Sequence, residues 1–239
     1  MELSIDTSTS SASLALSEKG KVVAEMNWHT RQNHTAELLP NLIHLLDQCK
    51  SSIRDIQAVT VAKGPGTFNG IRVGLSTAKG LSFALSIPLL GISTLEALAF
   101  PYIAFGLPVC PILAAGRKEI ATALFHSRDG FVEKIAPEHI STADAVCESV
   151  TERTIFCGEI GNELSDKLES DLGDNAIIIH DSLLRIAGCL ARLGWRRIES
   201  EDFDDPSTLQ PLYLKRPGIT VPKKRRHDAM SNMRPRGQG

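Results

Sequence analysis

The sequence lacks any uninterrupted apolar run long enough to span a membrane. Its first residues, Met1 to Asp6, have neither the basic segment nor the long apolar segment of a signal peptide, and they run directly into a strand-like pattern. These absences predict a cytoplasmic protein with no membrane partner.

Close pairs of metal-binding or disulfide-forming residues are also missing. The five cysteines are scattered, odd in number and without a CxxC pair, which favours small buried side chains in a reducing compartment. The histidines form no HxxxH or HExxH pattern, so surface or capping roles are expected for His29, His34 and His44. We therefore predict no metal site, and no activated nucleophile or catalytic residue is identifiable by position.

The 239 residues carry a net charge of −2 that is unevenly spread. Residues 215–239 hold eight Lys or Arg and one Asp, whereas the rest of the chain holds 18 basic and 27 acidic residues. An acidic body does not resemble an autonomous nucleic-acid binder. The basic end, residues 216–239, is predicted to be a disordered tail; RNA contact through phosphates is the alternative, although the tail lacks aromatic residues for base stacking.

The first half of the chain alternates strand and helix patterns. Strands are expected at 3–6, 11–16, 22–28, 56–62 and 88–92. Helices are expected at 38–49, 71–85 and 95–104, where apolar or small residues recur at helical spacing. Pro40 should start or kink the first helix, and Thr94 can cap the last.

A similar order restarts after the break at Gly106-Leu107-Pro108. Strands are expected at 109–115, 120–126, 131–136, 154–157 and 176–179, with helices at 142–150, 162–172 and 183–193. The repeated order predicts an internally duplicated α/β fold, with one domain at 1–105 and a second at 106–215.

Two polar segments of the first half suggest a phosphate site. Asp6-Thr7-Ser8-Thr9 lies where the first strand turns into the second, and its carboxylate and hydroxyls can face a phosphate or its metal. The alternative is a turn whose side chains satisfy local backbone groups.

The glycine-rich loop Gly64-Pro65-Gly66-Thr67-Phe68-Asn69-Gly70 joins a buried strand to a helix. Glycines permit close approach of a ligand to the backbone, and a helix N-terminus attracts anions. The loop is neither a Walker motif nor GxGxxG, so a tight structural turn is the competing interpretation. The candidate nucleotide-binding residues are Asp6, Thr7, Ser8, Thr9, Gly64, Gly66 and Thr67.

Several motifs together resemble the TsaB (YeaZ) family. They are Leu3-Ser4-Ile5-Asp6-Thr7-Ser8-Thr9, His34-Thr35-Ala36-Glu37-Leu38-Leu39-Pro40, and the loop from Gly64 to Gly74, which is similar to the family's GPGSFTGLRIG. Gly91-Ile92-Ser93-Thr94-Leu95-Glu96 and Pro211-Leu212-Tyr213-Leu214-Lys215 also look like family segments. The resemblance is strong over residues 1–100 and weak over 116–205.

The resemblance implies the duplicated actin-like ATPase fold shared by Hsp70 and sugar kinases, with two ribonuclease-H-like subdomains. It also implies a non-catalytic subunit that supports a TsaD-type catalytic subunit, beside a TsaE-type ATPase, in transferring a threonylcarbamoyl group to adenosine 37 of tRNA. The chain itself would need no cofactor, ATP or ADP could bind in the complex, and tRNA would be contacted indirectly.

In that family, helices matching residues 35–50 and 71–85 form the TsaD-binding surface and can also form homodimers. The expected contact residues are Leu38, Leu39, Leu42, Leu46, Arg72, Leu75, Ala78, Lys79 and Ser82. The sequence departs from the family at Ala114, where an Asp is usual, and at Ala121, where Tyr is usual. An ATP-binding or ATP-hydrolysing enzyme of the same fold is the alternative function.

Overall fold

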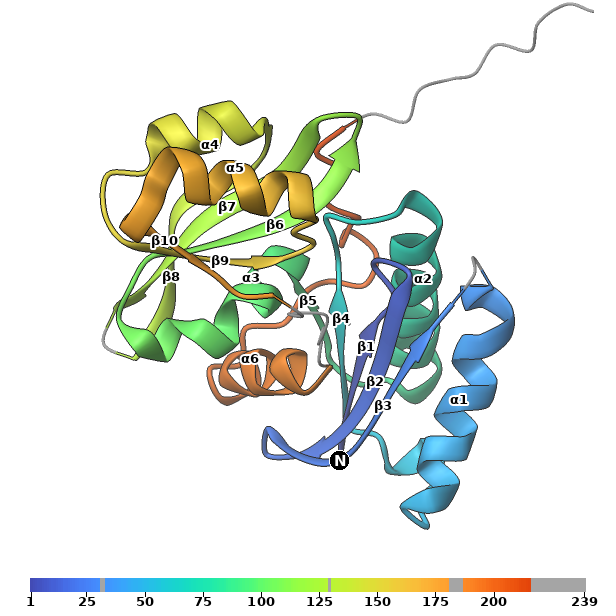
Figure 1. Cartoon of the computed structure of the whole chain (residues 1–239). Helices are drawn as coiled ribbons and strands as arrows, with labels where there is room; N and C mark the ends of the chain where they lie inside the picture. The colour runs from blue at the N-terminus through green and yellow to red at the C-terminus, as the bar shows by residue number, and fades with distance from the viewer. Residues whose placement is uncertain (31–32, 129, 181–186, 216–239) are drawn as a thin grey trace, which may run out of the picture.

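The computed structural model describes residues 1–30, 33–128, 130–180 and 187–215. Their strands form two five-stranded sheets with helices packed against them (Figure 1). Within these ranges no helix combines the length and apolar character needed to cross a membrane. The basic tail predicted at 216–239, and the start of the helix predicted at 183–193, lie outside the described residues.

The first sheet has the order β3-β2-β1-β4-β5. β1 is antiparallel to β2 and parallel to β4, as expected when a hairpin is followed by helical crossovers. Its elements are β1 (Glu2–Asp6), β2 (Ser11–Glu18), β3 (Lys21–His29), α1 (His34–Gln48), β4 (Ala58–Ala62), α2 (Phe68–Leu85), β5 (Leu89–Ile92) and α3 (Thr94–Ala99). We call this sheet with α1 and α2 the first lobe.

The second sheet repeats the same connectivity, with the order β10-β9-β6-β7-β8. Its elements are β6 (Val109–Gly116), β7 (Glu119–Arg128), β8 (Phe131–Ser141), α4 (Ala143–Ser149), β9 (Thr154–Gly158), α5 (Asn162–Leu172), β10 (Ala176–Ile178) and α6 (Ala187–Glu199). We call this sheet with α4 and α5 the second lobe. The internal duplication predicted from the sequence is confirmed.

The duplication extends to a backbone detail. Gly64, just after β4, and Gly158, at the end of the equivalent β9, both have a φ of 106°. A side chain at Gly158 would lie 2.1 Å from the carbonyl oxygen of Ile112. Glycine is needed at both places because L side chains rarely adopt this conformation.

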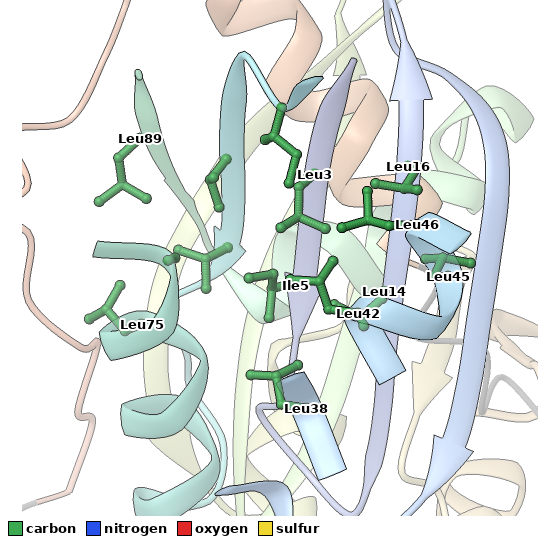
Figure 2. Packing of buried hydrophobic residues seen from close by; sticks show 14 of the residues in the cluster. Leu3, Ile5, Leu14, Leu16, Leu38, Leu42, Leu45, Leu46, Leu75 and Leu89 are labelled. Carbon is green, nitrogen blue, oxygen red and sulfur yellow. The ribbon is translucent and has the colours of Figure 1, made fainter. Parts of the chain in front are cut away.

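The core of the first lobe lies between its sheet and α1 and α2 (Figure 2). Leu3 and Ile5 project from one face of β1 because side chains two apart on a strand share a face. They meet buried leucines that recur at helical spacing on α1: Leu38, Leu42, Leu45 and Leu46. This packing fixes which face of α1 remains toward solvent.

The last helix of each half of the sequence packs on the sheet of the other half. α3 lies in the second lobe's core, where Leu95 and Leu98 contact the cluster that includes Val109 and Phe125. α6 packs on the first sheet, where a side chain at Gly194 would collide with Thr60. The strands therefore divide at the predicted boundary near residue 105, but the helices cross it and join the lobes (Figure 1).

Two local predictions about helix ends were wrong. α1 begins at His34, so Pro40 lies inside it. The helix tolerates Pro40 because that residue is exposed, where water can satisfy the carbonyl group left without a donor. Ser93, not Thr94, occupies the N-cap position of α3, and Thr94 donates its N–H to Gly64 O at 2.9 Å.

The cysteines are free thiols, and three of them are buried: Cys110, Cys157 and Cys189. Burial raises the pKa of Cys110 to about 11 and that of Cys189 to about 12, and it also raises the pKa of Cys157. These thiols stay protonated and shielded near pH 8, where only a thiolate reacts rapidly.

A thiol reagent should therefore modify only Cys49 and Cys147 in the folded protein, and all five cysteines after denaturation. Rapid native labelling of a third cysteine would contradict this packing.

Candidate functional site

The turn between β1 and β2 is buried, and its polar groups bond within the protein. Oδ1 of Asp6 accepts hydrogen bonds from the backbone N–H of Ser8 at 2.8 Å and from its hydroxyl at 2.7 Å. The hydroxyl of Thr7 donates to Gly70 O at 2.7 Å, and Thr9 is also buried. The turn thus has the backbone-satisfying role that competed with phosphate binding.

The glycine-rich loop packs directly on this turn. A Cβ atom at Gly66 would lie 2.1 Å from Ser8 O, and one at Gly70 would lie 2.0 Å from Thr7 O. Thr67 donates its N–H to Ser8 O at 2.6 Å, and its hydroxyl oxygen caps α2 by accepting from Gly70 N at 3.3 Å. No phosphate fits between segments in such contact, so the glycines serve close backbone packing.

The other side of the loop contacts a segment near the end of the described chain. We call residues 209–215 the linking segment. A side chain at Gly64 would meet the carbonyl oxygen of Leu212 at 2.8 Å, and Leu212 donates its N–H to Lys63 O at 2.7 Å. Leu209 is part of the first lobe's core, whereas Leu214 packs against the core of the second lobe. The linking segment therefore spans the junction between the lobes.

A small cavity lies at this junction. Its volume is about 100 Å³, and it is lined by the glycine loop, by β6, β7 and β8, and by the linking segment. Pockets that hold drug-sized ligands typically have about 300 Å³ or more. Ala114, at the position where the family usually has Asp, lines this cavity and donates its N–H to Oε2 of Glu159 at 3.0 Å. This cavity is therefore small for a nucleotide-sized ligand.

A larger cavity, about 560 Å³, lies where α1 and α2 begin. Its described lining includes Thr35, Thr67, Asn69 and Arg72 but no acidic residue. His34 also lines it; this histidine is buried, and the burial lowers its pKa. Two helix N-termini and a guanidinium make the cavity suitable for an anionic group.

The predicted partner-contact residues divide into buried and accessible sets. Six are buried within the chain's own first lobe and are not available to a partner: Leu38, Leu42, Leu46, Leu75, Ala78 and Ser82. The prediction that these six residues contact a partner was wrong, because the apolar stripe that contains them on each helix packs into the first lobe's core. Leu39 and Arg72 are exposed, and Lys79 is half-buried.

The structure exposes apolar residues on the same helices that the sequence did not single out. Ile43 lies one turn beyond Leu39 on α1, and Phe83 on α2 is 86% exposed. Five exposed residues of α2 follow helical spacing in one row, with Phe68 and Ala84 exposed beside its two ends: Asn69, Arg72, Ser76, Gly80 and Phe83. α1 and α2 run side by side on one face of the sheet (Figure 1). We call their exposed residues the α1–α2 surface.

An aromatic cluster ends the row on α2. The rings of Phe68 and Tyr213 stack with centroids 5.2 Å apart, and the guanidinium of Arg72 lies 4.0 Å from the centre of the Phe68 ring. The Nε of Arg72 donates to the hydroxyl of Tyr213 at 3.0 Å. Tyr213 was noticed in the sequence only as part of a family-like segment, because its partners lie far away along the chain.

Within the described ranges of the chain, no three or more His, Cys, Asp or Glu side chains lie together in a group that could hold a metal ion. His29 is exposed at the end of β3, and His44 is exposed on α1 beside Gln48. The histidines are therefore spread over separate environments.

Known proteins resemble this chain in both sequence and fold. Residues 20–153 match the family described as TsaD, tRNA N6-adenosine threonylcarbamoyltransferase. The tRNA threonylcarbamoyladenosine biosynthesis protein TsaB of Bacillus subtilis (strain 168) is 32% identical over 180 residues, which cover 74% of this chain and 78% of that protein.

Two solved structures show the fold. YeaZ from Pseudomonas aeruginosa superposes with a TM-score of 0.76 at 24% identity, covering 90% of this chain and 100% of that one. A second structure is the activator of the 2-hydroxyisocaproyl-CoA dehydratase from Clostridium difficile, solved with bound ADPNP. It superposes with a TM-score of 0.51 at 10% identity, covering 84% of this chain and 96% of that one. The predicted actin-like ATPase fold is confirmed, and the sequence matches show that this chain belongs to the TsaB (YeaZ) family.

Proposed function

We propose that this chain is a non-catalytic cytoplasmic subunit in the biosynthesis of threonylcarbamoyladenosine in tRNA. It binds and activates a TsaD-type catalytic subunit, which transfers the threonylcarbamoyl group to adenosine 37. A TsaE-type ATPase joins the assembly, and tRNA is contacted indirectly. The name of the Bacillus subtilis relative supports the pathway, and the TsaD family match supports a partner of related fold.

The α1–α2 surface is the observation that carries this proposal. Leu39, Ile43 and Phe83 expose apolar side chains on two adjacent helices whose other faces are anchored in the core. Large apolar and aromatic residues on rigid helices are typical anchors of protein interfaces. The same surface can pair two copies of this chain when the catalytic subunit is absent.

Complementation tests the proposal. The gene is expressed in bacteria depleted of their own TsaB, and threonylcarbamoyladenosine in tRNA is measured by mass spectrometry of nucleosides. Restored modification is expected. Size-exclusion chromatography of the chain mixed with a TsaD homologue should show a complex. Failure of both at micromolar concentrations would reject the proposed role.

An ATP-binding or ATP-hydrolysing enzyme is the second candidate, and the cavity where α1 and α2 begin favours it because Arg72 and two helix N-termini line that cavity. The small volume of the cavity between the lobes, about 100 Å³, argues against it. We expect the isolated chain to show no ATP turnover above a buffer control. Turnover that Arg72→Ala abolishes would support the enzyme instead. Asp6→Ala is a poor test because Asp6 holds the buried β1–β2 turn.

A further inference from the structure

The end of the α1–α2 surface that contains Phe68 and Arg72 is supported by the linking segment. Both residues belong to α2, but the contacts that hold them come from Tyr213, which is 141 residues beyond Arg72 in the sequence. The ring of Tyr213 stacks on Phe68, and its hydroxyl accepts a hydrogen bond from Arg72 Nε. The three side chains therefore form one ordered unit at the surface.

Tyr213 is itself held from both sides. Its neighbour Leu212 is bonded to Lys63 in the first lobe, and Leu214 is packed in the core of the second lobe. One residue further, the Lys215 ammonium pairs with Glu119 of β7. A ring whose backbone is anchored at both neighbours has a fixed position, so it can hold the long side chain of Arg72 in one orientation.

This orientation leaves the outer edge of the guanidinium free. The Nε atom of Arg72 is used by Tyr213, while no residue in the described part of the chain accepts a hydrogen bond from its two Nη groups. Two parallel N–H groups match the two oxygens of a carboxylate. The exposed rings of Phe68 and Tyr213 lie beside them and supply apolar contact.

We infer that Tyr213 is a positioning residue for partner recognition: it presents Arg72 to a carboxylate of the TsaD-type partner, at the α2 end of the α1–α2 surface. This inference rests on the proposed function, because it assigns a chemical contact to the same surface. Holding Arg72 in its binding orientation before association reduces the conformational entropy lost on binding.

A double-mutant cycle tests the inference. Dissociation constants for a TsaD homologue are measured by calorimetry with the full chain, Tyr213→Phe, Arg72→Ala and the double variant. Tyr213→Phe keeps the ring and removes only the hydroxyl, so folding should be retained, and thermal denaturation checks this. We expect affinity to fall about tenfold for Arg72→Ala and about threefold for Tyr213→Phe. The double variant should be no weaker than Arg72→Ala alone.

Salt dependence identifies the partner's charge. The affinity of the wild type should fall between about 50 mM and about 500 mM NaCl, and Arg72→Ala should show much less of this fall. Phe105→Ala, which changes an exposed phenylalanine outside α1 and α2, is the matched control and should bind as the wild type does.

The possible failures are distinguishable. Phe83→Glu, which places a charge on the exposed aromatic residue of α2, should disrupt the complex if the α1–α2 surface is the interface. If it does, additive effects of Tyr213→Phe and Arg72→Ala, or wild-type affinity in both, would overturn the positioning role alone. An unchanged salt dependence in Arg72→Ala would overturn the carboxylate contact. Normal binding by Phe83→Glu would remove the proposed interface and this inference with it.

Discussion

Replacing Phe83 by glutamate should abolish the complex with the TsaD-type partner. Phe83 is 86% exposed at the end of the exposed row on α2, so the change should leave the fold intact. The loss of an aromatic anchor from an interface costs about 2–4 kcal/mol, which corresponds to roughly 30-fold to 1000-fold weaker binding. A buried carboxylate adds a further desolvation cost. Calorimetric titration with a TsaD homologue measures the effect.

Phe105→Glu is the matched control for this experiment. Phe105 is also a strongly exposed phenylalanine, but it lies at the end of a 3-10 helix (Phe100–Phe105) outside α1 and α2. Binding should survive this change, and only Phe83→Glu should fail in the complementation assay. Equal loss in both variants would indicate a general effect of surface charge, and the α1–α2 surface would then lose its assigned role. Ala78→Glu is unsuitable, because Ala78 has no exposed surface and its charge would enter the core.

Gly70→Ala should destabilise the protein strongly. The new Cβ would lie 2.0 Å from the backbone oxygen of Thr7 and 2.6 Å from the hydroxyl that caps α2. Neither the β1–β2 turn nor the start of α2 can move away without breaking the bonds between them. We expect a loss of about 3 kcal/mol or more in the free energy of unfolding, measured by urea denaturation.

Gly80→Ala, in the same helix, should increase the stability that Gly70→Ala decreases. Nothing lies within 4 Å of the Cβ that this change would add. Alanine is favoured over glycine inside a helix by about 0.5–1 kcal/mol, so this variant should be more stable than the wild type. Similar stability losses in the two variants would show that helical propensity, and not contact with the β1–β2 turn, governs glycine in α2.

Most of the fold could be predicted from local patterns. Short runs of apolar and small residues indicate β2 and β7, although consecutive residues of both strands are buried. Leucines at three-to-four spacing indicate α1, because that helix buries one face. The repeated element order indicates the duplication without any tertiary contact. The ends of α1 and α3 were less predictable, since backbone bonds from Asn33 and Gly64 decide where those helices begin.

The candidate site was harder to predict than the fold. The loop from Gly64 to Gly74 identified the family resemblance, but its spacing suited a phosphate site as well as a tight turn. Only the tertiary structure brings Ser8 and Thr7 against Gly66 and Gly70. Their contact assigns the glycines to backbone packing, which no local pattern could distinguish from ligand binding.

Element order, the duplicated α/β fold and the resemblance to the TsaB family can be predicted from the amino-acid sequence, because they depend on residue type and spacing along the chain. The burial of particular leucines on α1, the exposure of residues on α2 and the contact of Tyr213 with Arg72 are visible only in the folded chain. Burial and long-range contact depend on the packing of whole elements, which local spacing does not specify. A stripe of apolar residues predicts a helix face, but only the sheet beneath it decides which part of that stripe remains available to a partner.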